Sequence, residues 1–284
     1  MPTDQIGSFI THANYLRAFA TIAGFDSLVP NRLQVLSDLK QRCQATPHFQ
    51  GLTQRTVDLP QLRRSLNNAW ATELVLGIAG RVSPSDTFIR VANNWGVVQL
   101  YYVLYHGTQA YHVATANPRP KSHPSTQRIF ANTWSRQGSL PPWNLAADQT
   151  GYPQFPTTWI PDSTVGTFTP CTTSTAWDLA ATALRSTRRG AIDQEYKDER
   201  DRKAKKRIKD WNAQESARLA QGKKARKLRQ FPKANLTAAE RAAISNGVRT
   251  HVLIDYLYRL RIKTNYVDAD MFTEGPQTIF RLGW

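Results

Sequence analysis

The longest apolar stretch of the chain, from Thr87 to about Thr115, constrains the fold more than any other segment. Its apolar residues fall on most sides of a helix, and it is far longer than a β-strand, which usually has about 3–10 residues. We therefore predict a buried helix at the centre of the structure. Trp95 and Leu100 are expected to lie in its core-facing part, where truncation to alanine would cost on the order of 2–5 kcal/mol.

Other segments show the same helical period. Apolar residues recur at helical spacing, and Gly, Pro or capping residues stand near the ends of the runs. The alternation typical of strands is nearly absent, and no repeat of fixed length is visible. The sequence therefore predicts an all-α fold. The further predicted helices run from Ser8 to Phe25, from an Asn31 cap through Leu39 to before Pro47, from a start at Asp58 and Pro60 through Leu62 to Ile78, from His123 through Trp134, and from the capping box Thr237–Glu240 towards Gly247.

The segment from His251 to Asp268 carries a clear helical stripe. Arg261 stands four residues after the third member of this stripe, so it is expected to continue the buried face. Arg259 lies on another side of the same helix. The members of the stripe are Leu253, Ile254, Leu257 and Leu260.

Two interpretations of these arginines are open. Two guanidiniums near Tyr266 could clamp a phosphate, because arginine presents a planar fork of permanently charged donors. Alternatively, Arg259 pairs with Asp255 one turn earlier, and both arginines simply favour the C-terminal end of a helix. The residue types by themselves favour the second interpretation.

Residues 138–170 mix prolines with aromatic residues and keep no sustained period. Because this composition is too aromatic for a solvated linker, we predict an ordered excursion held to the body by Trp143, Phe155 and Trp159. Ser174 or Thr175 is then expected to cap a short helix that ends at Leu184.

A basic arm follows, from Arg185 to Arg229. It holds 17 Lys or Arg against 7 Asp or Glu, a net charge of +10 out of the chain's +16. Asp198, Glu199 and Asp201 each precede a basic residue by four positions, which supports an exposed helix. The arm has almost no apolar stripe, so it is not expected to bury itself in the core.

Such a charge favours a polyanionic partner, because self-repulsion opposes the compact state unless the charge is neutralised. A merely solvated face is the alternative. The arm lacks the apolar face of a membrane-surface helix, so nucleic acid is the expected partner. The candidate nucleic-acid-binding residues are Arg202, Lys203, Lys205, Lys206, Arg207, Lys209, Lys223, Lys224, Arg226, Lys227 and Arg229, together with Arg261.

Several other site classes lack their signatures. The sequence contains no P-loop, dinucleotide-binding glycine motif, zincin motif or nucleophile elbow, so no cofactor is expected. Cys43 and Cys171 are expected to be reduced thiols, and no metal site is predicted from them. Neither a signal peptide nor an apolar run of about 18 residues is present, and a cytoplasmic location away from membranes is expected.

Histidines are candidates for proton transfer, but their spacing says little. His106 and His112 are six positions apart on the central helix, so they point to different sides. Each is more readily interpreted as a core or surface imidazole than as a catalyst.

The aromatic-rich run Trp95–Ala110, followed by Lys121 to Phe130, and the stretch from Arg259 to Asp268 together resemble the HEPN superfamily (higher eukaryotes and prokaryotes nucleotide-binding). The second stretch is similar to the family's ribonuclease motif of Arg, a few residues, His, one residue and Tyr. Arg259 and Tyr266 match this motif, whereas Thr264 stands in the His position. Another branch of the family has Arg, three residues, then Asp-Tyr, and Arg261 with the pair Asn265-Tyr266 resembles that pattern.

The resemblance implies a HEPN-like helical bundle formed by residues 83–137 and 236–284. Residues 1–82 would be an N-terminal helical region, 138–184 the excursion and 185–235 the basic arm. It also implies a homodimer or a subunit of a larger complex, in a bacterial defence or toxin system.

Two function classes follow. In the first, the protein binds nucleic acid, RNA rather than DNA, without cleaving it. In the second, it is a metal-independent endoribonuclease that uses Arg259, Tyr266 and a recruited His106 or His123. The first is preferred, because the motif lacks an imidazole for general acid–base catalysis.

Overall fold

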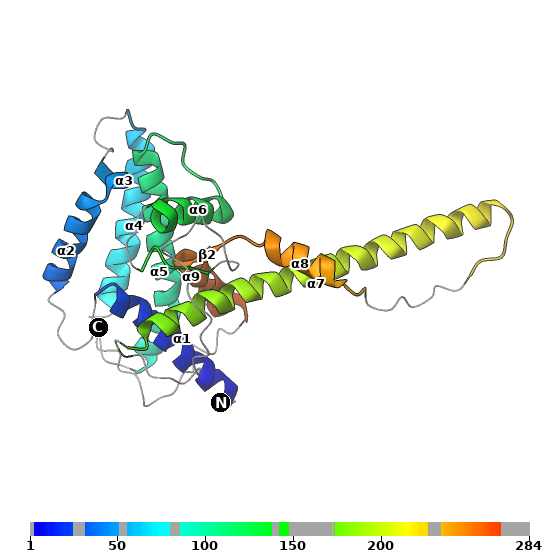
Figure 1. The fold of residues 1–284 in the computed structure, drawn as a ribbon, viewed down its shortest axis with the longest axis horizontal. Helices are drawn as coiled ribbons and strands as arrows, with labels where there is room; N and C mark the ends of the chain where they lie inside the picture. Colours follow the sequence, from blue (N-terminus) through cyan, green and yellow to red (C-terminus); the bar gives the residue numbers. More distant parts are fainter. Residues whose placement is uncertain are drawn as a thin grey trace. The chain divides into compact units, whose positions relative to one another are not determined.

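The computed structural model describes residues 3–24, 32–50, 56–79, 86–137, 142–147, 172, 174–226 and 234–267. The fold is all-α, as predicted (Figure 1). The chain divides into two compact units. Unit 1 comprises Met1–Thr187 and Thr250–Trp284, and unit 2 comprises Arg188–Arg249.

Unit 1 contains most of the helices. Apart from the short helix predicted to end at Leu184, the predicted helices are confirmed, with ends that move by a few residues. Two short strands, which the sequence did not predict, pair antiparallel with Ala146 opposite Val252. The elements of unit 1 are α1 (Thr3–Ile22), α2 (Arg32–Ala45), α3 (Pro47–Gln50), α4 (Leu59–Ala79), α5 (Asp86–Ala114), α6 (His123–Phe130), the π-helical η1 (Ala131–Gln137), β1 (Ala146–Ala147), β2 (His251–Val252), α9 (Leu253–Ile262) and the π-helical η2 (Lys263–Val267).

Helix α5 is central in unit 1, as its all-round apolar pattern predicted. It contacts α4, α6, α9 and η2, and Figure 1 shows α4 running alongside it. Tyr101 and Val113 on α5 are buried, and Leu100 packs against the core. The prediction for Trp95 is wrong, because its side chain is 57% exposed. A helix with apolar residues on every side does not reveal which of those sides lacks a neighbour.

Helix α7 (Ala176–Ala220) corrects a second prediction. The short helix expected to end at Leu184 and the helix of the basic arm are one continuous helix. No proline interrupts this sequence, and the Arg189–Asp193 ion pair bridges one turn just past the expected end, with 3.1 Å between Nε and Oδ1. The composition changes at Arg185 because the surroundings of the helix change there, and its backbone hydrogen bonding continues.

The first turns of α7 belong to the core of unit 1. Leu179 and Leu184 are fully buried there, alongside the alanines between them. The predicted stripe on α9 is also buried. At the start of α9 the Asp255 carboxylate accepts the N–H of Val252, with 2.9 Å between N and Oδ2. This bond satisfies one of the amide donors that a helix start leaves without an intrahelical partner.

One anchor of the predicted excursion lies in the described residues. Trp143 packs against the core, and the Ser135 hydroxyl donates a hydrogen bond of 2.6 Å to its carbonyl. Trp143 is therefore confirmed as an anchor. Phe155 and Trp159 lie outside the described residues.

No helix in the described ranges is both long enough and apolar enough to cross a bilayer.

Ala116 holds a strained backbone conformation just after α5. Its φ is +61°, the left-handed region that alanine disfavours. The amides of Ala116 and Asn117 reach back to the carbonyls of Val113 and His112, at 2.9 and 3.3 Å, which is a Schellman C-cap.

Ala116→Gly is therefore expected to raise the free energy of unfolding by about 0.5–1 kcal/mol. The relieved strain of roughly 1–2 kcal/mol exceeds the entropy that glycine adds to the unfolded chain. Urea unfolding measures this change. The control Ala71→Gly, at an exposed position inside α4, is expected to destabilise by about 1 kcal/mol. Equal destabilisation by both variants would contradict the strained, left-handed conformation of Ala116.

Candidate nucleic-acid interface

Unit 2 pairs the outer part of α7 with α8 (Ala238–Gly247). Near the start of the unit, the Arg188 guanidinium donates a bond of 2.8 Å to the carbonyl of Ser245. Further along α7, the Tyr196 hydroxyl donates one of 3.2 Å to the carbonyl of Arg241. Contacts that advance along α7 move backwards along α8, so the two helices are antiparallel.

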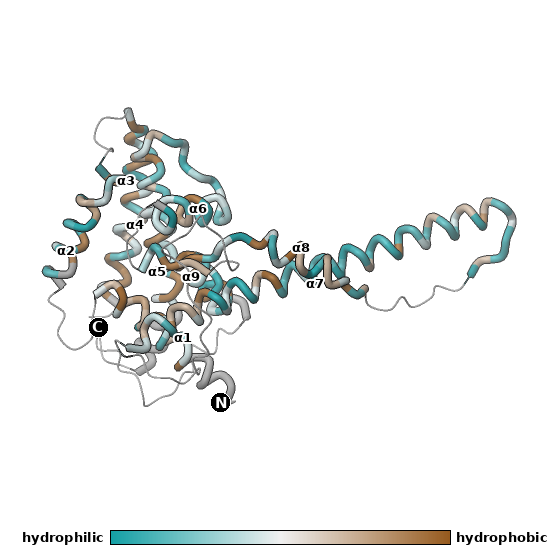
Figure 2. Tube along the Cα trace, viewed as in Figure 1, coloured by the Kyte–Doolittle hydropathy of each residue, from teal (hydrophilic) through white to brown (hydrophobic). Residues whose placement is uncertain are grey.

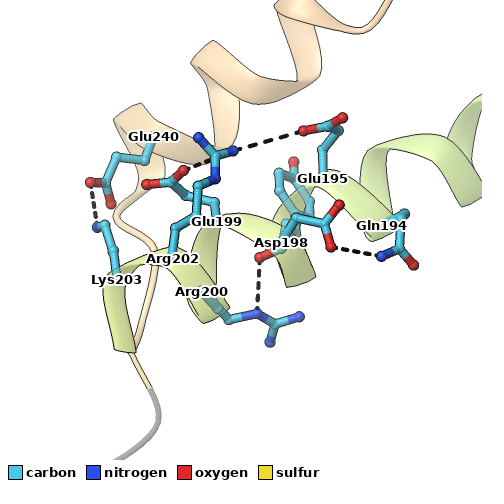
Figure 3. Close-up of polar contacts among 9 residues, drawn as sticks. Gln194, Glu195, Asp198, Glu199, Arg200, Arg202, Lys203 and Glu240 are labelled. Atoms are coloured by element: carbon cyan, nitrogen blue, oxygen red, sulfur yellow. Dashed lines mark hydrogen bonds and ion pairs between the residues drawn. The ribbon is translucent and has the colours of Figure 1, made fainter. Parts of the chain in front are cut away.

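The capping box predicted at the start of α8 is confirmed and extends to α7. The Thr237 hydroxyl accepts from the amide of Glu240, whose carboxylate accepts from the amide of Thr237. The same carboxylate pairs with Lys203 of α7 (Figure 3). The Lys203 ammonium and the Thr237 amide together lower the pKa of Glu240 to about 2. Lys203, predicted to bind nucleic acid, therefore holds unit 2 together.

Arg202 also has partners within unit 2. Its guanidinium lies 3.0 Å from the carboxylate of Glu199 and 4.0 Å from that of Glu195 (Figure 3). Asp198 instead accepts a bond of 2.8 Å from the amide nitrogen of Gln194. The exposed helix is thus confirmed, but the predicted pairing of acidic residues with bases four positions later is wrong at these sites. Long side chains on a helix can pair with residues that come before or after them in the sequence, because both lie within reach.

The far end of α7 closes in a tight turn. Gly222 has a φ of +72°, and its amide bonds to the carbonyl of Leu219 at 2.9 Å. The amide of Lys223 bonds to the carbonyl of Arg218 at 3.1 Å, which completes a Schellman motif. A glycine is required here because it adopts positive φ without strain.

After this turn the chain is tied back to α7 by Glu215. The buried carboxylate of Glu215 accepts the backbone N–H of Arg226 at 2.6 Å and its side-chain Nε–H at 2.7 Å. These bonds lower the pKa of Glu215. Arg226, another predicted binding residue, is thus engaged inside unit 2. Lys227 and Arg229 lie outside the described residues.

The remaining predicted cations of unit 2 are available to bind a ligand. They lie on the outer part of α7 and just after its turn, where Figure 2 colours most residues as hydrophilic. Their side chains are exposed and make no ion pair with any described residue. They are Lys205, Lys206, Arg207, Lys209, Lys223 and Lys224.

Arg261 lies in unit 1, among aromatic rings. Its guanidinium carbon is 5.7, 5.1 and 5.8 Å from the ring centres of Tyr101, Tyr102 and Tyr258. The side chain is half-buried, and its Nε is buried without a hydrogen-bond partner among the described residues. The helical stripe predicted that Arg261 continues the buried face. The prediction is confirmed in part, because the side chain is half-buried rather than buried.

His123 on α6 joins this cluster. Its Nδ1 lies 2.6 Å from the hydroxyl of Tyr101, and its ring centre lies 4.7 Å from that of Tyr105. Burial raises the pKa of Tyr101, so its phenol keeps its proton, and the hydrogen bond between them engages Nδ1 of His123. Nε2 of His123 is therefore the ring nitrogen that Tyr101 does not engage. Burial, and then the charge of Arg261, lower the pKa of His123.

His106 on α5 contacts Tyr102 and Tyr105, which His123 also contacts. Its ring stacks on Tyr102 with 5.8 Å between centres and an interplanar angle of 20°. Its Nδ1 donates to Oε1 of Gln109 at 3.3 Å, because that oxygen also accepts from Arg119. The Nε2 of neutral His106 therefore keeps a lone pair. Burial lowers the pKa of His106 below its usual value of 6.5.

Arg259, the first arginine of the suspected motif, lies elsewhere in unit 1. Its guanidinium donates to the hydroxyl of Ser186 at 3.4 Å, and the predicted ion pair with Asp255 does not form. The aromatic groups that interact with its charge are Tyr15 and Tyr256. The arginine that accompanies His106 and His123 is therefore Arg261.

Thr264, which stands in the His position of the motif, supplies no general base. Thr264 is 1% exposed, and its hydroxyl donates a bond of 2.7 Å to the carbonyl of Leu260. Tyr266 lies in η2, and its side chain is outside the described part of the structure. Within the described residues, no three His, Cys, Asp or Glu side chains gather closely enough to hold a metal ion.

Sequence reasoning did not single out the tyrosines of this cluster. A signal was present, because Tyr101 with Tyr105 and Tyr102 with His106 are each four positions apart, which aligns them on a helix. That Arg261 and His123 meet them depends on how α5, α6 and α9 pack.

No protein-family model matches the chain, and no curated protein or solved structure shows significant similarity to it.

Proposed function

We propose that the protein binds nucleic acid, RNA in preference to DNA, through the exposed cations of unit 2, and that it does not cleave its ligand. The observation that carries the proposal is the division of the predicted basic residues into two sets. Arg202, Lys203 and Arg226 pair with carboxylates inside unit 2. The other six predicted basic residues that are described in unit 2 face solvent without such partners.

An exposed set of this kind suits a phosphate backbone. Lysine and arginine contacts with phosphates release condensed counterions, which drives association without regard to base sequence. A patch whose net charge is positive also attracts polyanions from a distance. The preference for RNA rests on the resemblance to the HEPN superfamily, as does a paired or multi-subunit assembly.

A membrane surface is a less suitable partner. From Lys197 to Ala220, the large apolar residues of α7 are Ile208, Trp211 and Leu219. Amphipathic helices that bind membranes bury a much richer apolar face.

The test removes only the available charges. In one variant Lys205, Lys206, Arg207 and Lys209 all become glutamine, which leaves the ion pairs of Lys203 and Arg202 intact. Affinity for a single-stranded RNA is then measured over a series of salt concentrations. The slope of log affinity against log salt is expected to flatten by about 3, since each lost phosphate contact contributes about 0.7.

A matched control loses the same number of charges from exposed positions of unit 1, with Arg63, Arg64, Lys121 and Arg128 changed to glutamine. Its slope is expected to stay close to that of the parent. Equal flattening in both variants would show that the salt dependence follows the net charge of the protein, whatever the position of the cations. An unchanged slope in the unit 2 variant would refute the proposed interface.

Endoribonuclease activity is the second candidate, and the meeting of His106, His123 and Arg261 favours it. Acid–base catalysis by positioned side chains typically contributes roughly 10²–10⁴-fold, so real cleavage would be visible above background. A time course on RNA with a chelator present is expected to show an intact substrate. Cleavage by the parent that disappears in His123→Gln would replace the binding proposal with this one.

A further inference from the structure

The cluster around Arg261 has a positive charge without an anionic partner. Within the described residues no carboxylate pairs with this guanidinium, which is held only against tyrosine rings. Cation–π contacts compensate a cation only in part, and the buried Nε donor is left without an acceptor. An anion with hydrogen-bond acceptors would satisfy both the charge and the donor.

The two histidines complement this charge. His123 offers its Nε2, because its Nδ1 is engaged with Tyr101. His106 has its Nε2 available, because Gln109 holds its Nδ1. Both rings are half-buried and contact Tyr102 or Tyr105, so they flank the same pair of tyrosines. Once each ring is protonated, its Nε2 carries a proton and can donate to an anion.

We propose that Arg261, His123 and His106 form a phosphate-binding site in unit 1, separate from the cations of unit 2, which takes up a proton as it binds the phosphate of a nucleotide. This inference rests on the proposed function for the identity of the ligand as a nucleotide. Arginine suits a phosphate because its planar fork donates two hydrogen bonds to two oxygens.

Proton uptake follows from the charges around the imidazoles. Those facing His123 are Arg261 of α9 and His106 of α5, and the one facing His106 is Arg119 of the loop before α6. The neutral neighbours are Gln109 and tyrosines 101, 102, 105 and 258. All of these groups are neutral or cationic near pH 7, so they disfavour imidazolium. A bound phosphate reverses this balance and raises the pKa of both histidines.

The experiment follows the histidine ring signals by NMR in the full-length protein with isotope-labelled histidine. Three probes are added separately: adenosine, adenosine monophosphate, and adenylyl adenosine, a dinucleotide with one phosphodiester and no terminal phosphate. We expect saturable shifts of the His106 and His123 signals with at least one phosphate-bearing probe and none with adenosine. A response to the dinucleotide identifies a backbone phosphate, and a response to the monophosphate alone identifies a terminal one.

The affinity for the phosphate-bearing probe is expected to increase as pH falls from neutrality, by up to about tenfold per pH unit for each proton taken up.

Arg261→Gln is expected to weaken binding of this probe about tenfold or more, as the loss of a charge-assisted hydrogen bond does. The matched control Arg128→Gln removes a charge from the exposed side of α6 and is expected to leave binding unchanged. The His12 signal reports the fold, since His12 is buried elsewhere in unit 1. If it moves in Arg261→Gln, His123→Gln serves as the second variant.

The absence of saturable shifts, or equal binding in Arg261→Gln and the parent, would overturn the inference. Neither result would affect the RNA affinity carried by the cations of unit 2, which the salt series measures independently. Conversely, phosphate binding at Arg261 together with an unchanged salt slope in the unit 2 variant would retain this site and refute the proposed interface.

Discussion

Leu179→Ala is expected to lower the free energy of unfolding by on the order of 2–5 kcal/mol, the range for large-to-small substitutions in a core. The Leu179 side chain is fully buried, in a helix that leaves unit 1 only a few residues later. Truncation removes its contacts and leaves a cavity that the packed neighbours cannot fill. Urea unfolding followed by tryptophan fluorescence measures the change.

Leu74→Ala is the matched control, because the same atoms are removed from a side chain that is 63% exposed. It is expected to change stability by no more than about 0.5 kcal/mol, as surface substitutions do. Trp95→Ala is expected to fall near the same limit, in contrast to its predicted core role. A small effect of Leu179→Ala, comparable to that of Leu74→Ala, would remove the start of α7 from the core.

Acidification is expected to destabilise unit 1 through His12. The side chain is 9% exposed, and its Nδ1 lies 3.1 Å from the hydroxyl of buried Tyr256. Burial, followed by the charges of Lys263 and Arg259, lowers the pKa of His12 from 6.5 to about 3. The unfolded chain therefore binds a proton at His12 below about pH 6.5, while the folded chain binds it only near pH 3.

Stability is thus fully present above pH 6.5 and falls as the pH decreases towards 3. The expected slope from this residue is up to about 1.4 kcal/mol per pH unit, the value for one proton. Urea unfolding at a series of pH values measures it. His12→Gln keeps an oxygen that can accept from Tyr256 but has no titrating ring. The slope of its free energy of unfolding against pH is therefore expected to be shallower than that of the parent by up to about 1.4 kcal/mol per pH unit. Parallel slopes for parent and variant would contradict a neutral, buried His12.

The helices could be predicted from the sequence because their signals are local. The capping box at Thr237 and Glu240 and the apolar stripe that includes Leu257 each involve residues within a turn or two. A helix end could not be predicted where the composition changes but the backbone hydrogen bonding continues, as at Leu184. The change from apolar to basic residues after Leu184 alters the surroundings of α7, and the helix itself continues.

The candidate sites could be predicted only as residue types. The excess of positive charge in residues 185–229 was evident, but charge alone does not show which cations have partners. Lys203 and Arg226 find theirs in Glu240 and Glu215, and the turn at Gly222 brings the second pair together.

By itself, the sequence determined that this protein is all-α, that a long helix lies at the centre of its bundle, which is unit 1, and that one region is strongly basic. These properties follow from the period of apolar residues and from composition. Only the tertiary structure decided that Trp95 faces solvent and that Arg261, rather than Arg259, meets His106 and His123. Such choices depend on which faces of α5, α6 and α9 are in contact, and the period of a single helix carries no information about its neighbours.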